Sequence, residues 1–430
     1  MAQADLSDWL AQRRAANSYE VSVVGLDELE GWAVDPDSGD LGHHTGKFFS
    51  VRGIEVSTDH REVASWSQPI ILQPEIGILG LLVRRFDGVP HCLLQAKMEP
   101  GNINLLQLSP TVQATRSNYT RVHHGSAVPY LEHFVTPRRG RVVFDALQSE
   151  QGSWFLDKRN RNIILEIEED VPLLEDFRWF AVDEVAELLH VANLVNMDSR
   201  TVLSGLPELY RSDDRGPALH TTGELLSWFT EAKARYTLDR RVVALSSVRD
   251  WTRSSRRISH RDGKYFDVVG VRVRATSREV ARWSQPMFAP RDRGVIAFLS
   301  RWAGGVRHVL VHARTEPGTG DVVEMSSTVN CTPANYADRR PLFLDEVLAA
   351  PPERVLVDVV HSEEGGRFYH AENSYRVVEV DDGFPLDVPE DYVWMTVNQL
   401  AGFVRYGNHV NVGARSLLTC MSRLPDRVAA

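Results

Sequence analysis

Most segments of this chain with a regular hydrophobic spacing alternate hydrophobic and polar residues, and this alternation predicts strands. Residues 46–57 and 263–274 alternate imperfectly and are rich in β-branched and aromatic residues, so each predicts a strand. Residues 76–98 predict a buried strand, a turn at Asp87-Gly88 and a second strand, and residues 294–314 repeat this hairpin. Hairpins favour mixed or antiparallel sheets, so the predicted fold class is α+β rather than a doubly wound parallel sheet.

Shorter stretches between the strands follow helical spacing. Residues 182–193, 343–350 and 397–408 place apolar residues three and four apart, which predicts helices. Thr221 or Thr222 is suited to cap a further helix, because Glu224 supplies an acid in its first turn. The helices predicted at the start of each half are carried by Leu6, Trp9 and Leu10 and by Leu225, Trp228 and Phe229.

The chain contains one domain-sized unit twice. Residues 43–119 and 260–336 align without a gap at a constant offset of 217, and 32 of the 77 positions are identical. The words REVASWSQP and QAKMEPG of the first copy return as REVARWSQP and HARTEPG. A period of roughly 200 residues is the size of a whole domain, so we expect two domains, 1–210 and 211–430, with a linker at 211–220.

The match resumes further along both copies. QSEQGSWF at 148–155 corresponds to HSEEGGRF at 361–368. Asn193, Asn196 and Arg200 correspond in turn to Asn408, Asn411 and Arg415. We expect residues kept by both copies to be scaffold or a shared ligand shell, and polar groups kept by one copy to be candidates for chemistry.

Composition and charge exclude several classes of protein. The net charge of −10, with acids and bases interspersed, disfavours a nucleic-acid surface, which needs a concentrated basic footprint. Three cysteines without paired or metal-ligand spacing are typical of a reducing cytosol, and the N-terminus lacks the apolar segment of a signal peptide. No run approaches 18 apolar residues, so we expect a soluble cytoplasmic protein without a membrane span.

Familiar cofactor and catalytic motifs are missing from the sequence. It contains no G-x-G-x-x-G after a strand, no Walker A loop, no G-x-S-x-G and no H-E-x-x-H. The pairs His43-His44 and His123-His124 would point to opposite faces of a strand, so neither pair suits one metal ion. We therefore expect no metal and no redox cofactor.

A dense block of directional polar residues, 95–134, is the leading candidate for a binding site. If 91–98 is a strand, Gln95, Lys97 and Glu99 share one face; if 104–114 is a strand, a second polar face runs from Gln107 to Gln113. A solvent-facing sheet surface is the alternative, although such surfaces usually carry Lys and Glu. The block suits a pocket for sugar hydroxyls and a pyrimidine edge. The cations available for a diphosphate are Arg116, Arg121, Lys158 and Arg161.

The second copy keeps less of this block. Arg314 replaces Lys97 and Pro333 replaces Arg116, so groups that could bind an anion are fewer. We expect the first copy to carry catalysis and the second to hold a remnant pocket. Trp66 and Trp283, each in the word WSQP, are either packing anchors or stacking platforms for a base, and packing is the commoner role.

Long segments in both copies carry a resemblance to a known family. They are QAKMEPGNINLLQLSPTVQATRSNYTRVHHG and LQSEQGSWF in the first copy, and HARTEPG and VHSEEGGRFYHAEN in the second. These segments resemble the NDP-hexose 2,3-dehydratases of antibiotic deoxysugar pathways. The resemblance covers essentially the whole chain. It implies a hydro-lyase that removes the C2 hydroxyl of a dTDP-4-keto-6-deoxy-D-glucose and leaves a ketone at C3.

The same resemblance implies an architecture and partners. Its family has two tandem Nudix-like domains with mixed β-sheets flanked by helices, forms homodimers, and carries a nucleotide-sugar pocket in each repeat. The acidic helix that binds metal in Nudix hydrolases is missing near EPG in both copies. A downstream 3-ketoreductase is expected as a partner, because the diketone product is unstable.

A dehydration of this kind needs a base, an acid and donors to an oxyanion. Glu99 or Tyr119 is the expected proton-transfer group, Lys97 the donor to the enolate, and Glu150 or His133 the group that assists departure of hydroxide. Glu99 has the alternative role of closing its loop. Predicted substrate contacts are Trp66, Gln95, Gln107, Thr115, Arg116, Asn118, Arg121, Gln148, Lys158, Asn160 and Arg161. The predicted second pocket contains Trp283, Arg314, Glu316, Asn335, Tyr336 and His361.

Two other functions fit the same residues. One is a non-catalytic nucleotide-sugar binding protein built on a degenerate hydrolase fold. The other is a Nudix-type pyrophosphatase whose metal site has drifted. The fate of the C3 hydrogen separates them, since only a dehydratase removes it.

Overall fold

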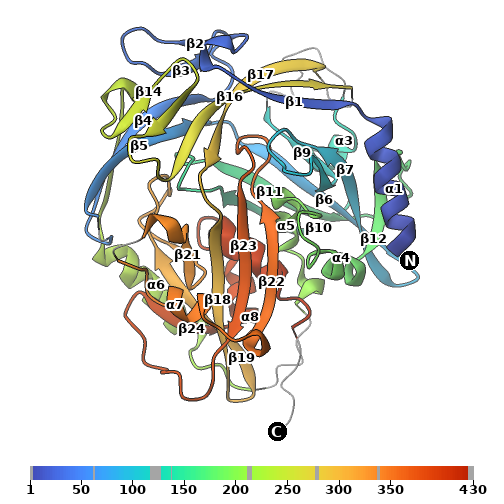
Figure 1. Ribbon diagram of the computed structural model, residues 1–430. Coiled ribbons are helices and arrows are strands. Elements are labelled where there is room, and N and C mark those ends of the chain that lie inside the picture. The colour runs from blue at the N-terminus through green and yellow to red at the C-terminus, as the bar shows by residue number, and fades with distance from the viewer. Residues whose placement is uncertain are drawn as a thin grey trace.

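The computed structural model describes residues 3–61, 63–116, 127–136, 138–210, 216–276, 280–336 and 339–424. Within these ranges the strands form two five-stranded and two seven-stranded sheets, with helices packed against them (Figure 1). The sheets are antiparallel or mixed, and the chain forms two tandem halves, so the predicted α+β class is confirmed. Among the described residues, no helix is long and apolar enough to cross a membrane.

The two five-stranded sheets each combine strands of both repeats. One contains β2 (Trp32–Val34), β3 (Leu41–His43), β4 (Ser50–Thr58), β5 (Ser65–Leu72) and β13 (Leu238–Val243). The other contains β1 (Tyr19–Val24), β14 (Trp251–Arg253), β15 (Arg257–His260), β16 (Phe266–Ala275) and β17 (Arg282–Pro290). The strands predicted over 46–57 and 263–274 are confirmed as β4 and β16.

The first strand of each repeat is exchanged between them. β1 pairs antiparallel with β16 from Tyr19↔Ala275 to Val24↔Gly270, and β13 pairs with β4 from Leu238↔Thr58 to Val243↔Gly53. Figure 1 shows the blue β1 lying along the yellow β16. Because each sheet is completed by the other repeat, the boundary at 210/211 divides the sequence but not these sheets.

The two seven-stranded sheets are mixed and are built within single repeats. The first contains β6 (Gly77–Phe86), β7 (Val89–Met98), β8 (Leu106–Ser109), β9 (Val112–Ala114), β10 (Arg141–Ser149), β11 (Arg159–Glu166) and β12 (Phe177–Ala181). The second contains β18 (Gly294–Ala303), β19 (Val306–Arg314), β20 (Glu324–Ser326), β21 (Val329–Cys331), β22 (Val355–Ser362), β23 (Glu372–Glu379) and β24 (Tyr392–Thr396). The pairs β11·β6 and β18·β23 are parallel, which makes both sheets mixed.

The predicted hairpins are confirmed as β6–β7 and β18–β19. Asp87 and Gly88 both have positive φ, 49° and 83°, as a two-residue hairpin turn of this twist requires. A strand over 104–114 is wrong as one element, because the chain breaks between β8 and β9 at Pro110 and Thr111. The polar side chains of that segment therefore point to different partners.

Helices cover the sheets and fill the centre. They are α1 (Gln3–Ala16), α3 (Leu131–Phe134), α4 (Val182–Leu188), α5 (Met197–Leu203), α6 (Thr222–Arg235), α7 (Leu344–Leu348), α8 (Val397–Phe403) and α9 (Val412–Thr419). Short 3₁₀ turns are η1 (Leu26–Glu28), η2 (Pro207–Leu209), η3 (Leu245–Ser247), η4 (Pro333–Asn335) and η5 (Pro352–Arg354). Thr221 caps α6, and Glu224 returns a bond to the Thr221 backbone N at 2.7 Å, as the sequence predicts.

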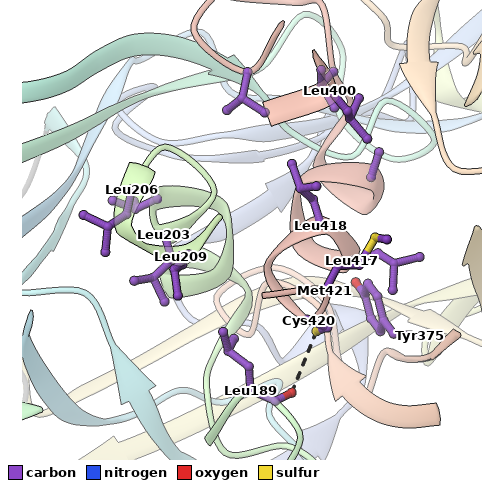
Figure 2. Packing of buried hydrophobic residues seen from close by; sticks show 14 of the residues in the cluster. Leu189, Leu203, Leu206, Leu209, Tyr375, Leu400, Leu417, Leu418, Cys420 and Met421 are labelled. Carbon is purple, nitrogen blue, oxygen red and sulfur yellow. Dashed lines mark hydrogen bonds between the residues drawn. The ribbon is translucent and has the colours of Figure 1, made fainter. Parts of the chain in front are cut away.

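The largest hydrophobic core spans both repeats. Leu203 at the end of α5, Leu206 just after it, and Leu417 and Leu418 of α9 are fully buried in it (Figure 2). Burying one such side chain contributes roughly 1.5–3 kcal/mol. The two repeats therefore share one hydrophobic core and are not separate domains joined only by a linker.

Two buried arginines cross this centre in mirrored fashion. Arg200 in α5 donates from Nη2 to the backbone oxygen of Ser362 at 2.7 Å, and Arg415 in α9 donates from Nη2 to that of Ser149 at 2.6 Å. Arg200 of the first repeat thus holds the end of β22 in the second repeat, and Arg415 of the second repeat holds the end of β10 in the first. That contact explains why both copies keep the arginine.

Candidate active site

A cavity of about 540 Å³ lies where the two repeats meet. Its volume falls within the roughly 300–1,000 Å³ of small-molecule sites. The first repeat contributes the polar side chains Glu30, His43, Thr45, Gln73, Glu75, Lys97, Glu99, Gln113, Thr115, Glu150, Lys158, Asn160 and Asp198, and the second contributes Arg282, Ser284, Gln285, Glu364 and Arg367. The site is therefore composite, although most of its charged groups come from the first repeat.

Lys97 and Glu99 stand where β7 ends. The Lys97 ammonium group donates to the backbone oxygen of Gln113 at 3.2 Å. The buried Glu99 carboxylate accepts from Gln113 Nε2 at 2.7 Å and from Asn196 Nδ2 at 3.4 Å. These amide bonds hold Glu99 in a fixed position on the cavity wall beside the cation.

The turn after Glu99 is fixed by the other repeat. A Cβ on Gly101 would lie 1.8 Å from the backbone oxygen of Phe368. A Cβ on Gly318, the matching residue of the second copy, would lie 1.6 Å from the backbone oxygen of Phe155. Both copies keep the word EPG because each turn packs directly on the backbone of the other repeat.

Glu150, Lys158 and Asn160 form another part of the wall. Asn160 Nδ2 donates to Glu150 Oε1 at 2.7 Å, and Asn160 Oδ1 accepts from the backbone N of Gly77 at 3.1 Å. Burial raises the pKa of Glu150, although Arg415 and Lys158 oppose the shift. Burial also lowers the pKa of Lys158. Both groups are held in surroundings that disfavour their charged forms.

Glu364 and Arg367 reach the cavity from the loop after β22. The backbone N of Gly366 donates to Glu364 Oε1 at 3.1 Å, and Arg367 Nε donates to Gln73 Oε1 at 3.1 Å. Burial raises the pKa of Glu364 to about 7; Arg367 opposes this shift and Glu99 adds to it. A carboxyl with this pKa exchanges its proton near neutral pH.

Asp198 completes the charged wall from α5. Its side chain is 3% exposed, and its Oδ1 has no hydrogen-bond partner among the described residues. Burial raises the pKa of Asp198 well above its usual value, and Glu150 and Glu99 raise it further, whereas Lys97 acts in the opposite direction. The side chain is therefore a neutral acid over a wider pH range than an ordinary aspartate.

Comparison with known proteins assigns the family. Residues 3–206 and 222–421 match the model of the NDP-hexose 2,3-dehydratase family. The chain belongs to this dehydratase family. The resemblance stated from the sequence is thereby confirmed over nearly the whole chain.

Three curated relatives of this dehydratase are named dTDP-4-dehydro-6-deoxy-alpha-D-glucopyranose 2,3-dehydratase. The Streptomyces violaceoruber protein is 56% identical over 98% of this chain and 97% of its own length. The Saccharopolyspora spinosa protein is 48% identical over 97% of this chain and 90% of its own length. The Amycolatopsis orientalis protein is 46% identical over 97% of this chain and 90% of its own length.

The cavity of the dehydratase brings together part of the predicted site. The predicted residues that line it are Lys97, Glu99, Thr115, Glu150, Lys158 and Asn160. They come from β7, β9 and the ends of β10 and β11, which converge because β11 pairs with β6 and β6 with β7 and β9. Tyr119, Asn118 and Arg121 lie outside the described residues.

Other predicted contacts lie between the repeats or on the surface. Gln107 Nε2 donates to Ser362 Oγ at 2.6 Å, and Gln148 Nε2 donates to the backbone oxygen of Val404 at 2.6 Å. Arg161 donates to both carboxylate oxygens of Asp145 at 2.7 and 2.6 Å. These three side chains are therefore engaged away from the cavity.

Three more predicted residues also lie outside the cavity wall. Gln95 is inside β7, where it pairs with Phe177 of β12. His133 is buried in α3, with its Nδ1 3.8 Å from the Glu169 carboxylate. Arg116 follows β9 and Thr115 but does not line the cavity. His133 thus lies away from Lys97 and Glu99. Of the two residues predicted to assist departure of hydroxide, Glu150 and His133, only Glu150 lines the cavity.

The two tryptophans of the WSQP segments lie in the reverse of the predicted arrangement, each near the predicted site of the other repeat. Trp283 lines the cavity of the first repeat, and Trp32 Nε1 donates to the backbone oxygen of the neighbouring Ser284 at 2.7 Å. Trp66 lies beside Arg61, whose guanidinium carbon is 5.7 Å from the Trp66 ring centre. The exchange follows from the fold, because each WSQP strand faces the site of the other repeat.

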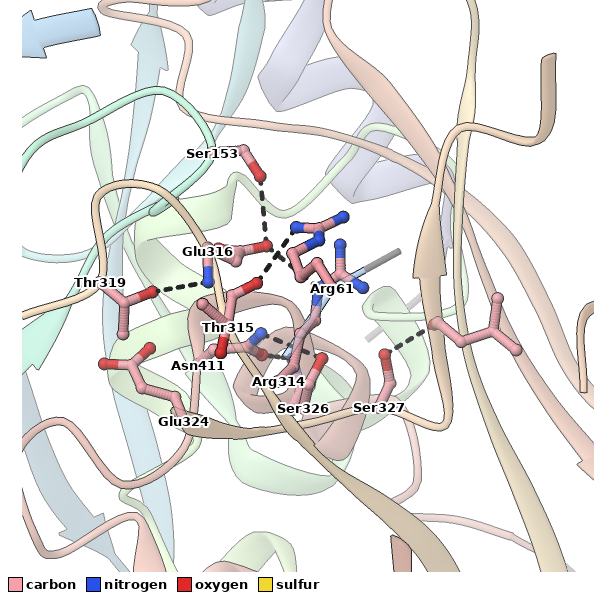
Figure 3. A network of polar contacts seen from close by, with 12 residues as sticks. Arg61, Ser153, Arg314, Thr315, Glu316, Thr319, Glu324, Ser326, Ser327 and Asn411 are labelled. Atoms are coloured by element: carbon pink, nitrogen blue, oxygen red, sulfur yellow. Dashed lines mark hydrogen bonds and ion pairs between the residues drawn. The ribbon is translucent and has the colours of Figure 1, made fainter. Parts of the chain in front are cut away.

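Arg61, a side chain of the first repeat, lies among residues predicted for the second pocket (Figure 3). Arg61 donates from Nη1 to the backbone oxygen of Thr315 at 3.1 Å and from Nη2 to Tyr336 Oη at 3.3 Å. Arg314 Nε lies 3.4 Å from Glu316 Oε1, which also accepts from Ser153. Arg314, Glu316 and Tyr336 thus lie near one another around Arg61.

Two residues predicted for the second pocket bind elsewhere. His361 is fully buried between the repeats, with Nε2 2.9 Å from the backbone oxygen of Leu189. Burial lowers the pKa of His361 well below its usual value. Asn335 accepts from the backbone N of Tyr265 at 3.3 Å.

The sequence prediction missed several charged residues that line the cavity: Glu30, Glu75, Asp198, Arg282, Glu364 and Arg367. Asp198 carried a usable signal, because Gly413 stands at the matching position of the second copy, so one copy alone has the carboxyl. Glu364 carried the same signal, since Gln151 stands at the matching position of the first copy, but it belongs to the second repeat and reaches the first cavity only through the tertiary fold.

Proposed function

We propose that this protein removes water across C2 and C3 of dTDP-4-keto-6-deoxy-D-glucose and releases the 3,4-diketo-2,6-dideoxy sugar. One observation carries the proposal: Lys97 and Glu99 share a cavity with carboxyl groups whose pKa is raised. A base, an oxyanion donor and proton donors are thereby gathered around one ligand-sized space. The three relatives are named for this reaction.

The chemistry assigns the two residues at the end of β7 to the first step. The C3 hydrogen is acidic because it lies α to the C4 ketone, so Glu99 removes it and an enolate forms. Lys97 donates to the C4 oxygen, where the negative charge develops; one such donor contributes about 2.7–4 kcal/mol. The enolate then expels the C2 hydroxyl, and the resulting C3 enol takes a proton at C2 to give the diketone.

The nucleotide diphosphate has cations available in the same cavity. Lys158 and Arg367 both line it, and Arg367 is near enough to contribute to the lowered pKa of Lys158. Two neighbouring cations stabilise an anion and are relieved of mutual repulsion when it binds. We therefore assign the diphosphate to this pair, with the sugar extending toward Lys97.

We further propose the finer architecture that the family resemblance implies. Residues 1–210 and 211–430 would be two Nudix-like domains, a proposal supported by the mixed sheet within each repeat. A homodimer in the cytoplasm is proposed with them, and three free, buried cysteines suit a reducing compartment. A 3-ketoreductase would consume the reactive diketone.

Proton exchange tests the proposed reaction. The dTDP-4-keto sugar is incubated with the protein in D₂O, and the C3 hydrogen is followed by NMR. We expect the C3–H signal to disappear, with deuterium incorporated at C2 of the product. A bound but unchanged ligand would support a binding protein, and release of dTMP would support a pyrophosphatase; either result would contradict the dehydratase.

A further inference from the structure

Asp198 lines the cavity, and no side-chain hydrogen bond to it is found among the described residues, whereas Glu150 and Glu364 each accept one. It is the second residue of α5, is 3% exposed and lines the cavity. Its Oδ1 is buried and has no hydrogen-bond partner among the described residues. A buried polar atom left in this way is unfavourable, so the site is stabilised when a ligand supplies the missing partner.

The charges around Asp198 favour its protonated form. Glu150, Glu99 and Glu364 all raise the pKa of Asp198 beyond the effect of burial, and Lys97 acts against them. A protonated carboxyl can donate a hydrogen bond, whereas the carboxylates around it can only accept one. Protonated Asp198 therefore offers the cavity a proton.

Comparison of the two repeats separates Asp198 from Glu150. Glu150 has Glu363 as its counterpart, and each accepts a bond from the matching asparagine, at 2.7 Å from Asn160 and 2.6 Å from Asn373. A carboxyl that makes the same bond in both copies is a scaffold element. Gly413 stands where Asp198 would have its counterpart, so this acid is specific to the first cavity.

We propose that Asp198 is the general acid that protonates the C2 hydroxyl as it leaves. The assignment rests on the proposed dehydration and takes this role from Glu150. In the step, the enolate electron pair forms the C2–C3 double bond, the C2–O bond breaks, and the Asp198 proton passes to the departing oxygen to make water. Asp198 is left as a carboxylate and regains a proton from solvent or from the C3 hydrogen held by Glu99.

A substrate analogue with fluorine in place of the C2 hydroxyl tests the role, because fluoride leaves without being protonated. Asp198→Asn should lower turnover of the natural substrate roughly 10²–10⁴-fold, the usual contribution of one general acid or base. Fluoride release from the 2-deoxy-2-fluoro analogue should stay within about tenfold of wild type, because the acid is not needed.

Deuterium exchange provides the second readout. In D₂O, Asp198→Asn should still exchange the C3 hydrogen of the natural substrate, since Glu99 and Lys97 remain, but should not eliminate water. Loss of both C3 exchange and fluoride release would show that Asp198 only positions other groups, and would overturn the assignment. Failure of wild-type protein to consume the substrate would instead refute the dehydratase function itself.

Two further variants guard against misfolding. Asp198→Gly copies the residue that α9 carries at the matching position, so this helix start is compatible with glycine. It should show the same split between the natural substrate and the fluoro analogue. Glu324→Gln neutralises another buried carboxyl, outside the cavity, and should leave the rates for both substrates unchanged. Full activity in either Asp198 variant would contradict the proposal.

Discussion

Substitution of Gly101 by alanine tests the contact that joins the two repeats at the site. The backbone N of Gly101 donates to the Gly365 oxygen at 2.8 Å, and its oxygen accepts from the His370 N at 2.8 Å. The new Cβ would lie 1.8 Å from the backbone oxygen of Phe368, so the two backbones must separate. Gly101 is not among the positive-φ glycines, so alanine suffers from this collision alone.

The cost of that separation follows from the bonds that break. Two backbone hydrogen bonds contribute about 1 kcal/mol each, and forcing extra volume into a packed contact costs about 1–3 kcal/mol. We expect Gly101→Ala to lower the free energy of unfolding by about 3–5 kcal/mol. Because Glu99 is two residues away, turnover of the folded enzyme should fall as well.

Urea unfolding followed by tryptophan fluorescence measures the stability, and steady-state assays measure the turnover. Gly42→Ala is the matched control, since a Cβ there meets nothing within 4 Å. Gly318→Ala should destabilise to a similar extent, because its Cβ would lie 1.6 Å from the Phe155 oxygen. A Gly101→Ala protein as stable as the Gly42→Ala protein would refute the explanation that the EPG segment is kept because its turn packs on the backbone of the other repeat.

Four other outcomes are expected. Lys97→Ala should reduce turnover by about a hundredfold or more, whereas Arg314→Ala should cost little beyond stability; the reverse ranking in steady-state assays would move the active site to the second copy. Glu324 has its pKa raised to about 7 by burial, so the folded protein holds this proton more tightly and loses stability as pH rises from about 4.5 to 7. Glu324→Gln should remove that loss, about 3 kcal/mol between urea curves at pH 5 and pH 8. Dialysis against EDTA should leave substrate consumption unchanged without NADPH; a rate restored by Mg²⁺ would contradict this. Light scattering should give twice the 48.5 kDa chain mass, and a clean monomer at micromolar concentration would disprove the dimer.

Local patterns in the sequence were sufficient for the elements and for the duplication. The hairpin β6–β7 follows from alternation and from Asp87-Gly88, because a two-residue turn needs positive φ at both positions. The cap of α6 follows from Thr221 and Glu224 in the same way. These features depend on neighbours within a few residues, which a sequence displays directly.

Part of the site was also accessible without the fold. Four of the predicted residues line the cavity: Lys97, Glu99, Glu150 and Lys158. They were predicted from their residue types within segments that the two copies share or change. The same comparison of copies covered the segment from Asn196 to Arg200 and would have found Asp198 there, because Gly413 at the matching position has no side chain.

The sequence by itself determined the family, the α+β class, the repeat and the residues at the end of β7, since each is written in local spacing or in long shared words. Only the tertiary structure decided which repeat serves which site. The exchange of β1 and β13, the crossing of Arg200 and Arg415, and the contact at Gly101 carry Glu364 and Trp283 into the cavity of the first repeat. Such placements depend on contacts between residues more than 160 positions apart. A duplicated sequence supports such contacts equally well within a repeat or across the two repeats.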